Sequence, residues 1–146
     1  MDDLSRILLV EDNPDDAELI SYAFSKVGIG NPIIVVDDGE KAMDYVHGRS
    51  AYDDRRKFPV PGIILLDLKL PRRSGFEVLE AVRATEATRR VPVVVLTSSN
   101  QEEDIRQAYD MGANSYLVKP ISKDALVAMA RSLDAFWMKL NQSVAS

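Results

Sequence analysis

The 146-residue sequence contains no cysteine and a single histidine, His47. A disulfide framework, a thiolate metal site and a clustered-histidine metal site are therefore all excluded. The apolar run near the N-terminus, ILLV at 7–10, is too short for a signal peptide or a membrane span. We therefore expect a cytoplasmic protein with no membrane partner, and we interpret His47 as a surface residue.

An excess of basic residues is also missing, because 18 Lys and Arg face 23 Asp and Glu, for a net charge of -5. A basic footprint for nucleic acid is therefore absent, and no nucleic-acid partner is expected. We interpret the short basic clusters at 55–57, 72–73 and 89–90 as solvated loop charge.

The length is sufficient for one domain with a real core, but not for two. We expect a single domain over residues 1–146, with its core at about 5–138 and a short polar tail at 139–146. No repeat, low-complexity tract or linker divides the chain.

Short β-branched runs alternate with amphipathic stretches along the chain. The runs are nearly continuous in apolar character, which is typical of strands covered on both faces. Intervening helices, among them 14–27, 75–84 and 122–140, indicate right-handed crossovers. We predict an α/β fold, a doubly wound five-stranded parallel sheet of flavodoxin-like order 2-1-3-4-5 with helices on both faces. The predicted strands are 6–10, 32–36, 62–66, 91–96 and 115–118.

Residues typical of helix ends support this pattern. Asn13 before Pro14 predicts an N-cap and a first helical position, and Asp15 and Asp16 then occupy the first turn, where acids are favourable. We assign these two acids to helix capping and to no chemistry. A later helix could begin with either of two alternative capping boxes, and two glycines are expected to end helices. The boxes are Ser99 with Glu102 or Asn100 with Glu103, and the glycines are Gly28 and Gly112.

Polar side chains stand where the apolar runs end. Glu11 and Asp12 follow the first predicted strand, Asp67 follows the third, Thr97 ends the fourth and Lys119 follows the fifth. In an open parallel sheet the carboxyl ends of the strands share one edge, where ligands bind. We therefore expect three carboxylates, a hydroxyl and an ammonium to converge.

Three unpaired acids this close repel one another unless a cation lies between them. Oxygen ligands suit a hard ion, and Mg²⁺ is favoured because it keeps several waters and takes one or two carboxylates plus phosphate oxygens. A carboxylate beside Mg²⁺, with a lysine across the pocket, is a phosphoryl acceptor. The sequence therefore predicts that Asp67 accepts a phosphoryl group.

This ordered set of residues, completed by Pro120 after Lys119, resembles the receiver domain of bacterial two-component response regulators from about residue 6 to 133. The resemblance implies that Asp67 is the phosphoacceptor. Glu11, Asp12, Asp67 and the backbone carbonyl of Lys69 would hold Mg²⁺, with Mn²⁺ or Ca²⁺ able to substitute. Such a protein is not an enzyme in the usual sense, because it catalyses only its own phosphorylation and dephosphorylation.

The resemblance also implies a switch. Thr97, Ser98 and Lys119 would bind the phosphoryl group, and the bond between Lys119 and Pro120 would be cis. The phosphoryl group would draw the Thr97 hydroxyl toward itself, so that Tyr116 can turn into the space vacated. This would change the face formed by the fourth helix, the fifth strand and the last helix.

A stand-alone receiver is expected to act through proteins, because no DNA-binding domain follows. The partners implied are a sensor histidine kinase and an unknown downstream protein. The long connection at 48–61 and the segment LPRRSG at 70–75 look most like the small regulators paired with phytochrome-type kinases. The run Phe136-Trp137-Met138 leaves two interpretations open. Either the helix end packs on its own core, or Tyr116, Phe136 and Trp137 anchor a homodimer.

Three other classes are weighed against this interpretation. A haloacid-dehalogenase-type phosphatase would need a second acid two residues after its nucleophile, where this chain has Lys69. The side chain of Lys69 could overhang the site and either attract phosphate or obstruct water. A flavin-binding electron carrier would want a phosphate loop rich in Ser, Thr and Gly, whereas the segment 11–16 is acidic. A receiver-like scaffold that is never phosphorylated stays open, although an intact site argues against it.

Overall fold

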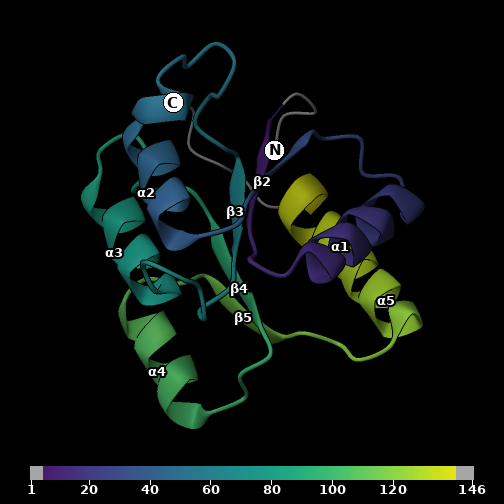
Figure 1. The fold of residues 1–146 in the computed structure, drawn as a ribbon. Coiled ribbons are helices and arrows are strands. Elements are labelled where there is room, and N and C mark those ends of the chain that lie inside the picture. Colours follow the sequence, from purple (N-terminus) through teal and green to yellow (C-terminus); the bar gives the residue numbers. More distant parts are fainter. Residues whose placement is uncertain (1–4, 141–146) are drawn as a thin grey trace.

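Five parallel strands form one sheet in the order β2-β1-β3-β4-β5, with helices on both of its faces (Figure 1). A computed structural model describes residues 5–140 of the chain. The predicted fold class and strand order are confirmed. The strands are β1 Ile7–Val10, β2 Ile33–Val36, β3 Ile63–Leu66, β4 Val93–Thr97 and β5 Ser115–Val118. The helices are α1 Pro14–Lys26, α2 Gly39–His47, α3 Gly75–Ala84, α4 Glu102–Asp110 and α5 Lys123–Leu133, with the short 3-10 helix η1 Ser50–Tyr52 and the π-helix η2 Asp134–Leu140.

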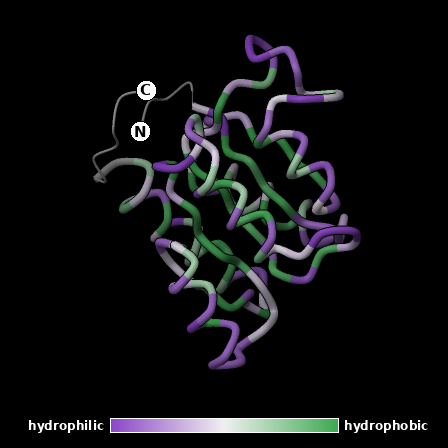
Figure 2. Tube along the Cα trace, turned by 90° about the vertical axis from the view of Figure 1, so that its left-hand side faces the viewer, coloured by the Kyte–Doolittle hydropathy of each residue, from purple (hydrophilic) through white to green (hydrophobic). Residues whose placement is uncertain are grey.

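The central strands are buried along their whole length, which explains their unbroken apolar sequences. Successive side chains alternate between the two faces. Leu8 and Val10 join the core beneath α2, α3 and α4, whereas Ile7 and Leu9 join the core beneath α1 and α5. Figure 2 shows the hydrophobic strands inside the molecule and the hydrophilic segments around them. None of the helices within residues 5–140 is long and apolar enough to cross a membrane.

The helix ends match the sequence in part. The Asn13 side chain accepts hydrogen bonds from the N–H groups of Asp15 and Asp16, as predicted. Gly28 and Gly112 follow the ends of α1 and α4 with φ angles of 85° and 101°, so both predicted stops are confirmed.

The capping box predicted for α4 is wrong in both of its forms. Gln101 is the N-cap, and no side-chain hydrogen bond caps this helix. The Ser99 hydroxyl instead joins the preceding loop to the helix: it accepts from the Gln101 N–H at 3.3 Å and donates to Asp104, in the first turn of α4, at 2.6 Å. The loop contact therefore replaces the expected cap.

The last predicted helix, 122–140, is divided into α5 and the wider turns of η2. Met138 is buried and Trp137 packs on the core beneath α1 and α5. Phe136 is 52% exposed, with its ring edge-on to that of Trp137 at 4.9 Å between centroids. Packing on the chain's own core thus holds for Trp137 and Met138. Residues 141–146 of the expected polar tail lie outside the described residues.

Candidate functional site

The carboxyl ends of the strands position the two buried acids. Glu11 follows β1 and donates its backbone N–H to the Val36 carbonyl at 3.0 Å, and Asp67 follows β3 and donates to the Val10 carbonyl at 3.0 Å. Each ladder therefore continues one residue past its strand. Gly75 allows α3 to begin against Asp67, because an added Cβ there would lie 2.2 Å from the Asp67 carbonyl oxygen.

Glu11, Asp12 and Asp67 form an acid cluster, in which each places a carboxylate oxygen within 4.8 Å of the others. Glu11 and Asp67 are buried, at 2% and 6% exposed, while Asp12 is exposed. Three acids this close favour a bound cation. Oxygen donors with one member open to water fit a hard divalent ion such as Mg²⁺, which retains part of its water shell. The residues present therefore fit the metal that the sequence predicts.

Lys119 lies within the reach of three carboxylates. Its Nζ lies 3.0 Å from Asp67 Oδ2, 3.0 Å from Asp16 Oδ2 and in direct contact with Glu11 Oε1. The backbone N–H of Lys119 donates to the Thr97 carbonyl at 2.8 Å, which fixes the start of this side chain beside β4. The predicted pairing of lysine and acids at one sheet edge is present.

Burial and hydrogen bonding shift the pKa values of Glu11 and Lys119 in opposite directions. Burial raises the pKa of Glu11 to about 7, against the lowering effect of hydrogen bonds from Lys119 and the Asn13 N–H. Burial alone would lower the pKa of Lys119, but hydrogen bonds to Glu11, Asp67 and Asp16 raise it above its usual value. Lys119 is therefore an ammonium at neutral pH, and Glu11 binds a proton more readily than an exposed glutamate does.

Asp67 has a different partner on each oxygen. Oδ2 accepts from Lys119, and Oδ1 accepts from the backbone N–H of Lys69 at 3.3 Å. The Lys69 side chain is exposed, so its backbone, and not its ammonium, contacts the carboxylate. No second acid stands at this position.

A chain of hydrogen bonds connects the end of β4 with Tyr116. Thr97 is fully buried, and its Oγ1 accepts from the Ser99 N–H at 3.5 Å. The Tyr116 hydroxyl donates to the Ser99 carbonyl at 2.9 Å, and the Tyr116 N–H donates to the Tyr109 hydroxyl at 3.1 Å. The Tyr116 ring already packs on the core. Ser98, between Thr97 and Ser99, is exposed.

The predicted cis bond before Pro120 is wrong, because the peptide bond between Lys119 and Pro120 is trans. The two isomers of a bond to proline differ by only about 0.5–1 kcal/mol. The contacts of Lys119 with Thr97 and Asp67 are made with the trans isomer.

Asp16 is a site residue that sequence reasoning assigned to helix capping alone. It retains its place in the first turn of α1, but its carboxylate accepts a hydrogen bond from Lys119. A signal was present, because Asp16 precedes Ile20 by four residues and Ala23 by seven, and both of these are buried. That spacing puts Asp16 on the helix face that lies over the sheet.

The connection between α2 and β3 packs on α2 through an aromatic group. Tyr52 lies 5.1 Å from both Tyr45 and Phe58, measured between ring centroids. Arg55 donates to the Val46 carbonyl at 3.0 Å and lies 5.7 Å from the Tyr45 ring centroid. The interpretation of this arginine as solvated loop charge is therefore wrong.

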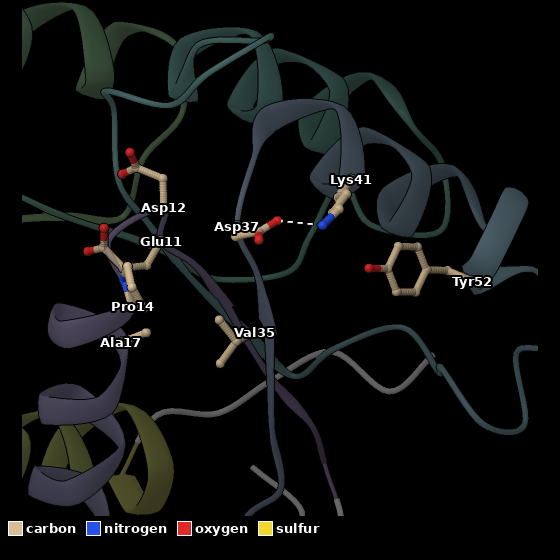
Figure 3. A pocket seen from close by; sticks show the side chains of 8 residues that line it. All are labelled: Glu11, Asp12, Pro14, Ala17, Val35, Asp37, Lys41 and Tyr52. Atoms are coloured by element: carbon tan, nitrogen blue, oxygen red, sulfur yellow. Dashed lines mark hydrogen bonds and ion pairs between the residues drawn. The ribbon is translucent and has the colours of Figure 1, made fainter.

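A pocket of about 350 Å³ opens beside the acid cluster. Figure 3 shows Glu11 and Asp12 at one end of it and Tyr52 at the other, with the ion pair of Asp37 and Lys41 between them. The connection at 48–61 therefore supplies one wall of a pocket that leads to the cluster. The lining residues are Glu11, Asp12, Pro14, Ala17, Val35, Asp37, Lys41 and Tyr52.

Comparison with known proteins agrees with this geometry. Residues 7–131 match the response regulator receiver domain. The probable methanogenesis regulatory protein FilR2 of Methanothrix harundinacea is 40% identical over 142 residues, which cover 94% of this chain and 86% of FilR2. The crystal structure of the Mn²⁺-bound form of response regulator Rcp1 has a TM-score of 0.87 at 34% identity, covering 97% of this chain and 99% of Rcp1. The crystal structure of the phosphorylated cyanobacterial phytochrome response regulator RcpA has a TM-score of 0.90 at 33% identity, covering 97% of this chain and 99% of RcpA.

The matched region runs from β1 into α5, so it contains the acid cluster, Thr97 and Lys119. The structures similar to this chain include a response regulator with bound Mn²⁺ and a phosphorylated phytochrome response regulator. By the extent of this match and by its fold, the chain belongs to the response regulator receiver domains of two-component signalling.

Proposed function

We propose that the chain accepts a phosphoryl group on Asp67 from a phosphohistidine of a sensor histidine kinase, in a reaction that depends on Mg²⁺. One observation carries this proposal. Asp67 is buried at the tip of β3, with one oxygen on the Lys119 ammonium and the carboxylates of Glu11 and Asp12 beside it. A single domain spanning residues 1–146 and a cytoplasmic location belong to the same proposal.

In the transfer, a carboxylate oxygen of Asp67 attacks the phosphorus while the P–N bond to the donor imidazole breaks. The electron pair of that bond returns to the imidazole, and Asp67 becomes an acyl phosphate. Bound Mg²⁺, or Mn²⁺ or Ca²⁺ in its place, would supply Lewis-acid stabilisation of charge on the phosphoryl oxygens. Glu11, Asp12, Asp67 and the Lys69 carbonyl would hold the ion, and Lys119 would neutralise a phosphoryl oxygen by a charge-assisted hydrogen bond.

The switch proposed for this site runs through the loop between β4 and α4. The bond accepted by Thr97 Oγ1 is long, so the hydroxyl can move to a phosphoryl oxygen, with Ser98 as a further donor. Because Tyr116 bonds to the Ser99 carbonyl, a movement of this loop is passed to β5. The face of α4, β5 and α5 would then change its affinity for a downstream protein.

Labelling with a small phosphodonor tests the proposal. The chain is incubated with acetyl phosphate and Mg²⁺, and its intact mass is measured. We expect one added phosphoryl group in the parent, none in Asp67→Asn or Asp67→Ala, and the parent result in Asp15→Asn, a change of the same kind in the first turn of α1. Labelling that survives in both Asp67 variants would overturn the proposal.

A phytochrome-type kinase is the donor that the comparisons favour, because similar structures include phytochrome response regulators. Transfer from such a kinase to the parent, and not to Asp67→Asn, is the expected outcome. We propose a phosphoacceptor and not a phosphatase with substrates of its own, because the position two residues after Asp67 holds Lys69. Steady hydrolysis of phosphate monoesters would contradict that part.

A homodimer is the remaining part of this proposal. Tyr109 and Val118 expose 48% and 44% of their surface on α4 and β5, and Phe136 exposes 52% beyond α5. Because Tyr116 and Trp137 pack on the chain's own core, Phe136 is the best placed of the three expected anchors. Sedimentation should show a dimer that Phe136→Ser weakens. A monomer at tens of micromolar, with and without phosphorylation, would remove this part.

A further inference from the structure

Asp16 contacts the site lysine but stands apart from the acid cluster. Its Oδ2 lies 3.0 Å from Lys119 Nζ. Within residues 5–140, the acids close enough to share a metal ion are Glu11, Asp12 and Asp67, without Asp16. Of the three carboxylates on Lys119, Asp16 is therefore the one that a bound ion leaves available.

The other two partners of Lys119 have a second task under the proposed function. When Glu11 and Asp67 coordinate a cation, the same two carboxylates have to neutralise both that cation and the Lys119 ammonium. Their contacts with Lys119 are therefore weakened. The Lys119 side chain is only 14% exposed, so water cannot fully replace the partners it loses. An ammonium buried without a partner is strongly unfavourable.

We propose that Asp16 is a positioning residue that holds the Lys119 ammonium while the acid cluster binds a divalent cation. This inference rests on the proposed function and adds a residue to it. Asp16 lowers the free-energy cost of ion binding, because Lys119 keeps this partner when Glu11 and Asp67 turn to the ion. It also keeps Nζ beside Asp67, where the phosphoryl group arrives.

Two simpler roles for Asp16 make different predictions. As a helix-capping acid, it would affect folding and not ion affinity. As a plain negative charge, it would attract a cation whether or not Lys119 is present. Asp15 is the matched control, because it occupies the same first turn and carries the same charge, and the N–H groups of both residues donate to Asn13.

The Mg²⁺ dissociation constant of the full chain, measured by titration calorimetry without phosphodonor, separates these roles. We expect Asp16→Ala to raise it about fivefold or more, and Asp15→Ala by less than about twofold. In a Lys119→Met background, Asp16→Ala should change it by less than about twofold, since Asp16 then has no ammonium to hold. Asp16→Glu should restore most of the parent affinity.

Equal effects of the Asp16 and Asp15 substitutions would overturn the inference. So would an equal effect of Asp16→Ala with and without Lys119, because that result shows charge acting alone. Thermal unfolding checks that each variant folds, and Asp16→Asn, which keeps the shape of the side chain, repeats the test should Asp16→Ala unfold.

The proposed function fails separately from this inference. Suppose that the parent binds Mg²⁺ and is labelled on Asp67, but that Asp16→Ala leaves the Mg²⁺ affinity unchanged. That result would contradict the inference and leave the proposed function standing. A parent that is not labelled by acetyl phosphate and Mg²⁺ sinks the proposed function. A parent without measurable Mg²⁺ affinity sinks both.

Discussion

Lys119 Nζ lies 3.0 Å from Asp67 Oδ2, although the two residues are 52 positions apart in the sequence. The sheet brings them together, because β3 and β5 flank β4 and all three end at the same edge. The proposed phosphoacceptor is therefore ion-paired with Lys119, and the pair connects stability with ion binding.

Removing the ammonium should destabilise the metal-free protein and increase its response to Mg²⁺. In Lys119→Met, Glu11 and Asp67 lose the positive charge that compensates their burial, and breaking such a pair costs roughly 3 kcal/mol. Bound Mg²⁺ would replace that charge, so most of the loss should return on adding it. Urea unfolding with and without Mg²⁺ measures both effects. Lys123→Met, a change at the start of α5, serves as control, and an equal loss in both variants would contradict this account.

Lys69 should control the lifetime of the acyl phosphate more than its formation. Its backbone N–H contacts Asp67 while its side chain is exposed, so the ammonium can cover a phosphoryl group and obstruct water. We expect Lys69→Ala to speed dephosphorylation about threefold to tenfold, equivalent to roughly 1 kcal/mol in the barrier. The final labelling yield at saturating acetyl phosphate should change less. Lys69→Arg should resemble the parent, and identical decay rates for Lys69→Ala and the parent would remove the idea.

The sheet and the acid cluster could be predicted because they depend on local signals and one topological rule. Continuous apolar runs such as ILLV and IILL indicate buried strands, and parallel strands must share their carboxyl ends. Once the strand order is chosen, Glu11 and Asp67 have to be neighbours. Their sequence positions alone therefore locate the site.

The contacts that were missed depend on side-chain placement that local sequence patterns do not specify. Asp16 satisfies the rules for a first helical turn, and nothing local shows that Lys119 lies across from it. Ser99 satisfies the pattern of a capping box, but Asp104 takes its hydroxyl. In both cases the local sequence pattern is satisfied by a helix-capping role. The folded chain instead pairs the side chain with a charged group, Lys119 for Asp16 and Asp104 for Ser99.

The hydroxyl of Ser99 should hold the start of α4 in place. It joins the Gln101 N–H to the Asp104 carboxylate, while α4 has no side-chain cap. Ser99→Ala should therefore lower the free energy of unfolding by about 1–2 kcal/mol. It should also speed amide exchange in residues 98–105. Ser98→Ala, at the exposed neighbouring position, should leave both unchanged. Comparable exchange in the two variants would show that the loop is held by other contacts.

Tyr45 should make the protein sensitive to alkaline pH. It is fully buried, its hydroxyl donates to the Pro59 carbonyl at 2.8 Å, and burial raises its pKa to about 12. An unfolded tyrosine loses its proton near pH 10. Between about pH 10 and 12 the unfolded state therefore binds fewer protons than the folded state, and stability falls as pH rises.

Urea unfolding at about pH 9 and about pH 11.5 should show this loss in the parent, on the order of 2 kcal/mol. Tyr45→Phe should lose less over the same interval, because the titrating group is gone, although it starts lower by about 1 kcal/mol for the unpaired Pro59 carbonyl. Tyr22→Phe, which changes an exposed ring, should follow the parent. If Tyr45→Phe and the parent decline in parallel, another group is responsible. The aromatic group would then hold the 48–61 connection without its buried phenol controlling stability at high pH.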